Sequence, residues 1–91
     1  MRRVYIFVYS DLMGGRDAMK ELVDSISQIL DWCYDMPNSF YIISELSANE
    51  LSDLIRSNYT GSHTRFFISE ITGNRQGYLP KKAWDFIKSA N

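Results

Sequence analysis

Few side chains in this sequence could do metal, acid–base or nucleophilic chemistry, and the carboxylate of Asp11 stands at the most suggestive position. It follows an apolar segment over residues 3–9 and begins a loop that contains Gly14 and Gly15. A carboxylate at a strand end can bind Mg²⁺ or Mn²⁺, because these cations prefer hard oxygen ligands. Two copies of Asp11 brought together by a dimer axis would share one cation, which could orient a phosphate and generate a hydroxide. The simpler interpretation makes Asp11 a turn residue or a cap of the next helix.

Two further residues have chemistry of their own but simpler structural roles. His63 is the only histidine, and in its polar turn it could act as a general acid or base at neutral pH or simply be solvated. Cys33 is the only cysteine, which excludes an internal disulfide, and between Trp32 and Tyr34 it is expected as a small buried hydrophobe. One histidine and one cysteine also exclude a zinc site built from Cys and His ligands.

A second candidate for phosphate contact is the run Gly14-Gly15-Arg16, which precedes a predicted helix. Backbone N–H groups at the start of a helix attract phosphate, and Arg16 could contact the same group. The chain contains neither G-x-x-x-x-G-K-[ST] nor G-x-G-x-x-G, so the nucleotide-binding folds that carry these motifs are excluded. The alternative is a flexible loop in which Arg16 pairs with Asp17 or Glu21 on the surface.

Basic residues are dispersed along the chain, and 10 Lys and Arg against 11 Asp and Glu give a net charge of −1. A polybasic tail is therefore excluded, and any contact with nucleic acid must come from a local patch. Arg3 could meet Arg65 if the first and last strands are neighbours. Arg75, Lys81 and Lys82 could extend that patch. The candidate nucleic-acid-binding residues are Arg3, Arg16, Arg65 and Arg75; the alternative is an ordinary solvated surface.

The length of 91 residues fits one domain over residues 1–91, and a hydrophobic content of 45% is enough for one core. Wholesale disorder is thereby excluded. No signal segment opens the chain, and no run approaches the roughly 20 apolar residues that a membrane span needs. With its lone cysteine, the sequence predicts a soluble protein of the reducing cytoplasm that does not contact a membrane.

The elements that must position these residues follow from periodicity. The apolar run over residues 3–9 predicts a central strand that is covered on both faces. Apolar residues then recur at three- and four-residue steps, which predicts an amphipathic helix of about four turns from Arg16 to Asp31. Residues 32–34 and 39–44 predict two strands that form a hairpin across a short turn.

The second half of the chain carries clearer helix signals. Ser47-Ala-Asn-Glu50 is a capping box, and the helix that it starts should end near residues 59–61, where Gly61 suits a left-handed terminal position. Residues 65–71 predict another strand, and residues 72–77 a loop. Pro80 suits the first position of a short terminal helix.

The predicted order β-α-β-β-α-β, followed by a helix, is that of an α+β ferredoxin-like sandwich with a four-stranded antiparallel sheet. Two helices would cover one face of the sheet. Because apolar residues alternate on both sides of the first strand, the opposite face also needs a cover: the terminal helix, a second subunit or a ligand. We expect a homodimer formed through the open sheet face or the terminal segment.

Several motifs resemble the small CRISPR-associated "Cas two" superfamily, especially its orphan SinR-like branch. Ser10-Asp11-Leu12 is similar to the end of the family's first strand, and Asn38-Ser39-Phe40 is similar to its hairpin strand. Residues 46–51 followed by residues 66–74 resemble the SinR-like helix start and final strand. The resemblance implies a ferredoxin-like homodimer. In some members the aspartate at the position of Asp11 is linked to metal-dependent cleavage of RNA or DNA, whereas others are non-catalytic and bridge integrase subunits while holding DNA.

Three functions stay open at this point. The first is a dimeric, nucleic-acid-associated binding or adaptor module. It is favoured because one carboxylate per chain supplies too few ligands for a strong metal site. The second is an endonuclease that depends on Mg²⁺ or Mn²⁺ at Asp11. The third is a mobile-element protein that binds and inhibits a host protein.

Overall fold

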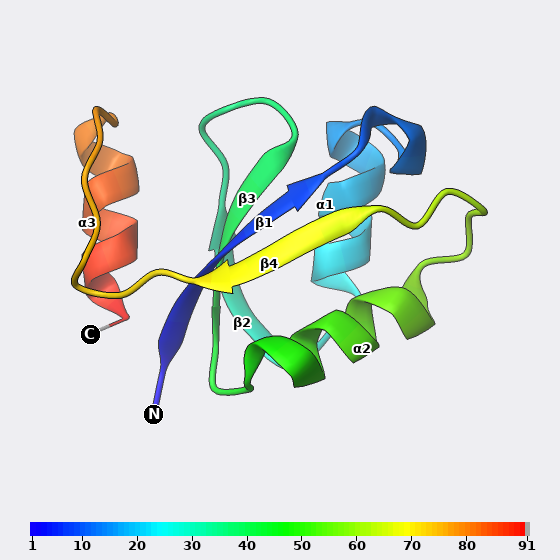
Figure 1. Cartoon of the computed structure of the whole chain (residues 1–91), viewed down its shortest axis with the longest axis horizontal. Coiled ribbons are helices and arrows are strands. Elements are labelled where there is room, and N and C mark those ends of the chain that lie inside the picture. Colours follow the sequence, from blue (N-terminus) through cyan, green and yellow to red (C-terminus); the bar gives the residue numbers. More distant parts are fainter. Residues whose placement is uncertain (91) are drawn as a thin grey trace.

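The computed structural model describes residues 1–90 and has the predicted α+β ferredoxin-like fold, with a four-stranded antiparallel sheet and three α-helices (Figure 1). A single 3₁₀ turn, η1, separates the first strand from the first helix. The elements are β1 (Arg3–Tyr9), η1 (Asp11–Met13), α1 (Arg16–Asp24), β2 (Ile29–Cys33), β3 (Ser39–Ser44), α2 (Ala48–Asn58), β4 (Phe66–Glu70) and α3 (Lys81–Ser89).

The strands lie in the order β2-β3-β1-β4, and every neighbouring pair is antiparallel. Phe7 of β1 stands opposite Phe40 of β3 on one side and Ile68 of β4 on the other. The prediction of a central strand over residues 3–9 is therefore confirmed. Because β1 is central, the residues that follow it are held at one end of the whole sheet.

One face of the sheet is covered by α1 and α2, as predicted (Figure 1). Tyr5 and Phe7 point to this side and are buried, together with Phe40 of β3. Leu51 and Ile55 supply the buried stripe of α2. The ring of Phe7 lies 6.4 Å from that of Phe40 between centroids, a distance typical of packed aromatic pairs.

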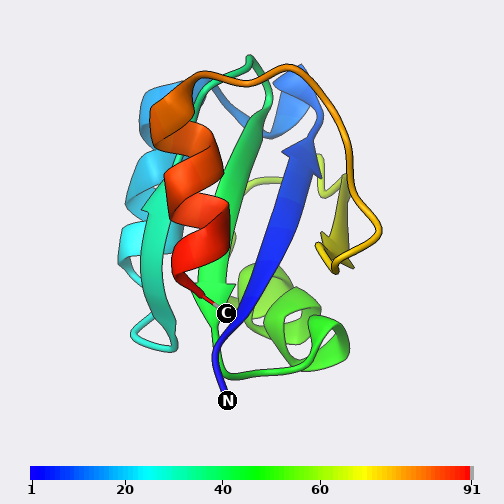
Figure 2. The same cartoon turned by 90° about the vertical axis from the view of Figure 1, so that its left-hand side faces the viewer.

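The other face is partly covered by α3. The terminal helix, one of the three covers that the sequence predicts for this face, therefore shields part of it. Val4 and Ile43 of the sheet are buried against Ala83 and Ile87 of the helix. Figure 2 shows α3 in front of β3 and to one side of β1, with β4 left uncovered. Aromatic and aliphatic residues on that uncovered part stay exposed, as described below.

The predicted helix over residues 16–31 is wrong in its second half, because α1 ends at Asp24 and β2 begins at Ile29. Ser25 terminates the helix, and its hydroxyl donates a hydrogen bond of 2.7 Å to the carbonyl oxygen of Leu22. Ile26 and Ile29 are still buried, one from the turn and one from the strand. The spacing of these residues is compatible with both conformations, so periodicity alone extended the helix too far.

The capping box at the start of α2 is confirmed. The Ser47 hydroxyl accepts a hydrogen bond from the Glu50 N–H at 3.2 Å, and the Glu50 carboxylate accepts one from the Ser47 N–H at 2.9 Å. The left-handed conformation predicted for Gly61 is wrong, because only Gly14 and Asn38 have positive φ angles within residues 1–90. The chain leaves α2 through an extended Tyr59 instead.

The sequence predicts Pro80 at the first position of the terminal helix, but Pro80 is the N-cap of α3 and so stands one position before the helix. The strand predicted at residues 32–34 begins earlier, at Ile29, because β2 includes residues that the sequence predicts as the end of the first helix. Over residues 1–90, no helix is long and apolar enough to cross a membrane.

Candidate functional site

Asp11 lies where the sequence places it, directly beyond β1 at one end of the sheet. It is exposed and is the first residue of η1, whose preceding residue Ser10 accepts a hydrogen bond from the Leu12 N–H at 3.1 Å. The Asp11 carboxylate accepts a hydrogen bond of 2.5 Å from the side-chain amide of Asn38. Its orientation is therefore fixed by a residue that is distant in the sequence.

Asn38 connects the turn before β3 to the end of β1 in two ways. Its backbone carbonyl accepts a hydrogen bond of 3.0 Å from the Tyr9 N–H, while its side chain contacts Asp11. Its φ angle of 59° is left-handed, which costs an L residue energy but is tolerated best by Asn, Asp and Gly. The sequence predicts a turn here, but the contact with Asp11 arises only from the pairing of β1 with β3.

The charges of Asp11 and Arg16 both act on the phenol of Tyr9. Burial raises the pKa of Tyr9, the charge of Arg16 opposes the rise, and the charge of Asp11 adds to it. The Arg16 guanidinium carbon lies 4.1 Å from the ring centroid of Tyr34. The end of the sheet thus combines a carboxylate, a phenol and a cation that stands over an aromatic ring.

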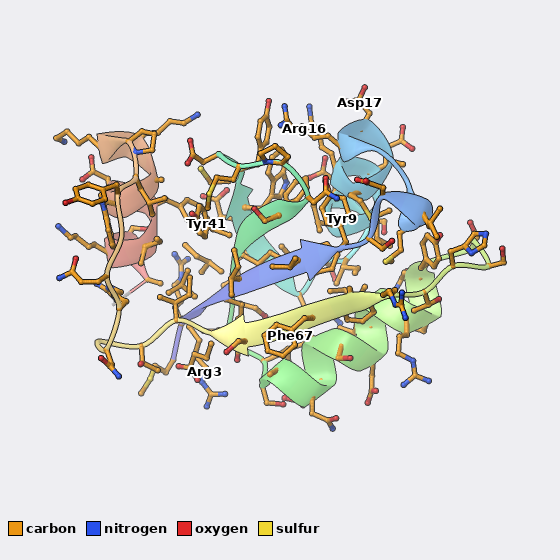
Figure 3. All side chains as sticks on the ribbon, turned by 45° about the horizontal axis from the view of Figure 1, so that its top comes forward. Arg3, Tyr9, Arg16, Asp17, Tyr41 and Phe67 are labelled. Atoms are coloured by element: carbon orange, nitrogen blue, oxygen red, sulfur yellow. The ribbon has the colours of Figure 1, made fainter. Side chains whose placement is uncertain are left out.

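A metal site is not complete within one chain. Over residues 1–90, no group of three or more His, Cys, Asp and Glu side chains could hold a metal ion. Asp17, the nearest acidic residue along the chain, points outward from α1 in Figure 3. The Mg²⁺ or Mn²⁺ that the sequence predicts at Asp11 would therefore have one carboxylate ligand from this chain, and a shared site would need a second copy.

The four candidate arginines do not form one patch. Arg16 and Arg65 lie at the Asp11 end, where the Arg65 carbonyl accepts a hydrogen bond of 3.0 Å from the Ser10 N–H. A small hollow of about 180 Å³ at this end is lined by Ser10, His63 and Arg65, among others. Arg16 does not line this hollow, and its guanidinium lies over Tyr34 instead.

Arg3 stands at the opposite end of β1, as Figure 3 shows, so the predicted meeting of Arg3 with Arg65 is wrong. The two strands are neighbours, but their antiparallel register brings Tyr5 opposite Glu70 and Tyr9 opposite Phe66. The pKa of Arg3 is raised, first by its hydrogen bond to Tyr5 and also by the charges of nearby glutamates.

Arg75 lies in a third place, on the loop that leads to α3. Its guanidinium donates a hydrogen bond of 3.3 Å to the Thr72 carbonyl, and it lines a hollow together with Trp84 and Lys88. The sequence interpretation missed the contribution of Trp84 and Lys88. A signal was present, because residues 72–91 contain four basic side chains and only one acidic side chain.

Two aromatic rings, Trp32 of β2 and Tyr34 directly after this strand, have a structural role. Lys20 lies 5.8 Å above the ring of Trp32, and Trp32 stacks with Tyr34 at a centroid distance of 6.4 Å. Phe40 contacts both rings from the core side. The cations of α1 and the ring of Phe40 both contact these rings, which therefore attach α1 to the sheet.

Comparisons of the chain with protein-family models, with curated proteins and with solved structures find no match. The resemblance to the Cas two superfamily therefore stays a prediction from the sequence motifs. The candidate site is described only by its own residues: an oriented Asp11, two arginines at the same end of the sheet, and a separate basic region beside α3.

Proposed function

We propose that this protein is a dimeric, nucleic-acid-associated binding or adaptor module that acts in the cytoplasm. The observation that carries the proposal is the separation of charge along the chain. Residues 72–91 contain four basic side chains and one acidic side chain, a net charge of +3, whereas residues 1–71 contain six basic and ten acidic side chains, a net charge of −4. A nearly neutral protein thereby acquires a local surface that attracts polyanions.

The Asp11 end of the sheet supports the same function. Arg16 and Arg65 are both exposed there, and neither forms an ion pair within the described residues. An arginine with free guanidinium donors is well suited to a phosphate oxygen.

The dimer is proposed from the apolar surface that α3 leaves open. Val8 and Phe67 stand opposite each other on neighbouring strands and are 42% and 65% exposed. Tyr5, Phe7 and Tyr9 belong to the core under α1 and α2, so the alternation along β1 directs Val8, and Phe67 opposite it, to the α3 side of the sheet. Burying such a pair against a second copy would remove apolar surface from water. A metal site shared by two copies would need this contact to bring the two Asp11 carboxylates together.

The binding function is tested by fluorescence anisotropy with labelled single-stranded and duplex oligonucleotides at several salt concentrations. We expect saturable binding whose affinity falls as salt rises, because phosphate contacts release counterions. Arg16→Glu combined with Arg65→Glu should weaken binding, whereas Arg56→Glu on α2, away from both basic regions, serves as the control. Absence of binding to every nucleic acid at low salt would contradict the proposal and favour a protein partner, including a host protein that this chain inhibits.

A second candidate function is a Mg²⁺- or Mn²⁺-dependent endonuclease, favoured by one specific observation. The Asp11 carboxylate is held by Asn38, whose left-handed backbone keeps the amide in place. An oriented carboxylate is a better metal ligand than a mobile one, and two copies would be needed to complete the site.

Cleavage is tested with Asp11→Asn, which should reduce metal-dependent hydrolysis of a labelled oligonucleotide to background. Asn38→Gly should give an intermediate loss, because glycine keeps the left-handed backbone but removes the contact with Asp11. Asp17→Asn provides an exposed carboxylate on α1 as the matched control. Equal cleavage by the wild-type protein and Asp11→Asn would exclude this function.

A further inference from the structure

An open hollow lies between the loop before α3 and one side of that helix. It has a volume of about 660 Å³, within the range of ligand pockets. Lys81, Trp84, Asp85 and Lys88 contribute from the helix, and their three-, four- and seven-residue spacing places them on one side of it. Arg75 contributes from the loop.

The hollow has an excess of positive charge, because three basic side chains and only one carboxylate, that of Asp85, line it. Asp85 is engaged by Lys81 through an ion pair of 2.8 Å on the helix surface. Arg75 donates one hydrogen bond to the Thr72 carbonyl and has further donors on its guanidinium. Among the residues that the structure describes, neither Arg75 nor Lys88 forms an ion pair. Two cations therefore remain for an anionic ligand.

The indole of Trp84 is the aromatic side chain that lines the hollow. Trp84 is half-buried, packs against the core cluster between α3 and the sheet, and also lines the hollow. A ring that packs against the core and also lines an open basic hollow is suited to stacking with a nucleobase, because it needs little ordering when a ligand binds. The rings of Trp32 and Tyr34 do not offer this, because Phe40 and two cations already contact them.

We infer that the hollow between residues 73–79 and α3 binds single-stranded nucleic acid, with a nucleobase stacked on Trp84 and phosphates contacted by Arg75 and Lys88. The inference rests on the proposed function and names its ligand class. A single strand fits better than a duplex, because a paired and stacked base has no free face for the indole. An acidic peptide would satisfy the cations but offers no nucleobase to stack on Trp84.

The test uses tryptophan emission, because the chain has only two tryptophans. In Trp32→Phe, Trp84 is the single indole, and titration with an oligothymidylate of about 12 nucleotides should quench its emission with the affinity measured by anisotropy. Arg75→Glu and Lys88→Glu should each weaken binding by about tenfold. Lys82→Glu makes the same charge change on the same helix outside the hollow and should weaken binding much less. Trp84→Phe should retain more affinity than Trp84→Leu.

The outcomes separate this inference from the proposed function. Binding of the oligonucleotide by anisotropy without a change in Trp84 emission, or with equal effects of Lys82→Glu and Lys88→Glu, overturns the inference and leaves the proposed function standing. Tighter binding of a duplex of the same length, or equal competition by polyglutamate, also overturns it. Absence of binding to any nucleic acid at low salt overturns both.

Discussion

At the scale of single residues, two unusual backbone positions flank the candidate site. Asn38 is left-handed and holds Asp11, and Gly14 has a φ angle of 146° where the chain passes from η1 to α1. Gly14 was interpreted from the sequence as part of a flexible loop. The structure instead gives it a conformation that L residues rarely adopt, next to the side chain of Ala18.

Gly14→Ala should destabilise the protein by about 1–3 kcal/mol, because alanine is strained at this backbone conformation. An added Cβ would also come within 3.0 Å of the Ala18 Cβ. Gly73→Ala is the matched control, since a Cβ there meets nothing within 4 Å and the φ angle is ordinary. Urea unfolding of both variants measures the difference, and equal stabilities would contradict the strain argument.

At the scale of elements, α1 and α2 begin in different ways. Both sides of the capping box at Ser47 and Glu50 are present at α2, whereas α1 starts at Gly15 without a side-chain cap. The start of α2 is thus fixed by local chemistry. The position of α1 depends more on its contacts with the sheet, including the cations of Arg16 and Lys20 over two aromatic rings in and directly after β2.

The capping box predicts a pH-dependent contribution of Glu50. Hydrogen bonds from Ser47, first from its backbone and then from its side chain, lower the pKa of Glu50 below its ordinary value of 4.5. A lowered pKa in the folded state means that the stabilisation is present above pH 4.5 and is lost as the pH falls through the folded pKa. Glu50→Ala should therefore reduce the free energy of unfolding more at pH 7 than at pH 3.

Urea unfolding of Glu50→Ala and the wild-type protein at these two pH values measures this effect. Asp53→Ala is the control, because Asp53 lies on the same helix outside the capping box. A loss for Glu50→Ala that is the same at both pH values would show that the ionised carboxylate is not what stabilises the helix start.

At the scale of the whole molecule, the sheet has one fully covered face and one that is only partly covered. The helix α3 shields Val4, Tyr41 and Ile43, and the apolar pair Val8 and Phe67 lies beyond it. The terminal helix and a second subunit were alternative covers in the sequence interpretation. The structure divides the face between the helix and an exposed remainder, and the proposed dimer concerns that remainder alone.

Phe67→Asp should convert the proposed dimer into a monomer, because a charge at the centre of the contact would have to be buried without a partner. Leu30→Asp is the control. Leu30 is also exposed, at 45%, but it lies on β2, the edge strand opposite β4. Size-exclusion chromatography with light scattering at micromolar concentration should give twice the chain mass of 10.6 kDa for the wild-type protein and for Leu30→Asp. A monomeric wild-type protein would rule out the dimer.

The sequence alone determined the kinds of elements and their order. Alternation along residues 3–9, the capping box at Ser47 and the apolar side of α2 are local signals, since each depends on residues within a few positions of one another. They were sufficient for the fold class and for placing Asp11 at a strand end. They did not separate helix from strand at residues 25–31, where a buried Ile26 and Ile29 fit either conformation.

Only the tertiary structure decided which of the candidate residues meet. The contact between Asp11 and Asn38, the separation of Arg3 from Arg65, and the hollow at Trp84 all depend on strand register and on where α3 docks. Register fixes the distance between residues far apart in the sequence, and an antiparallel pairing sends the two ends of neighbouring strands in opposite directions. A sequence pattern predicts which face of the sheet a residue occupies, but it does not predict which residue lies opposite on the neighbouring strand. This is why the elements could be predicted and the contacts within the site could not.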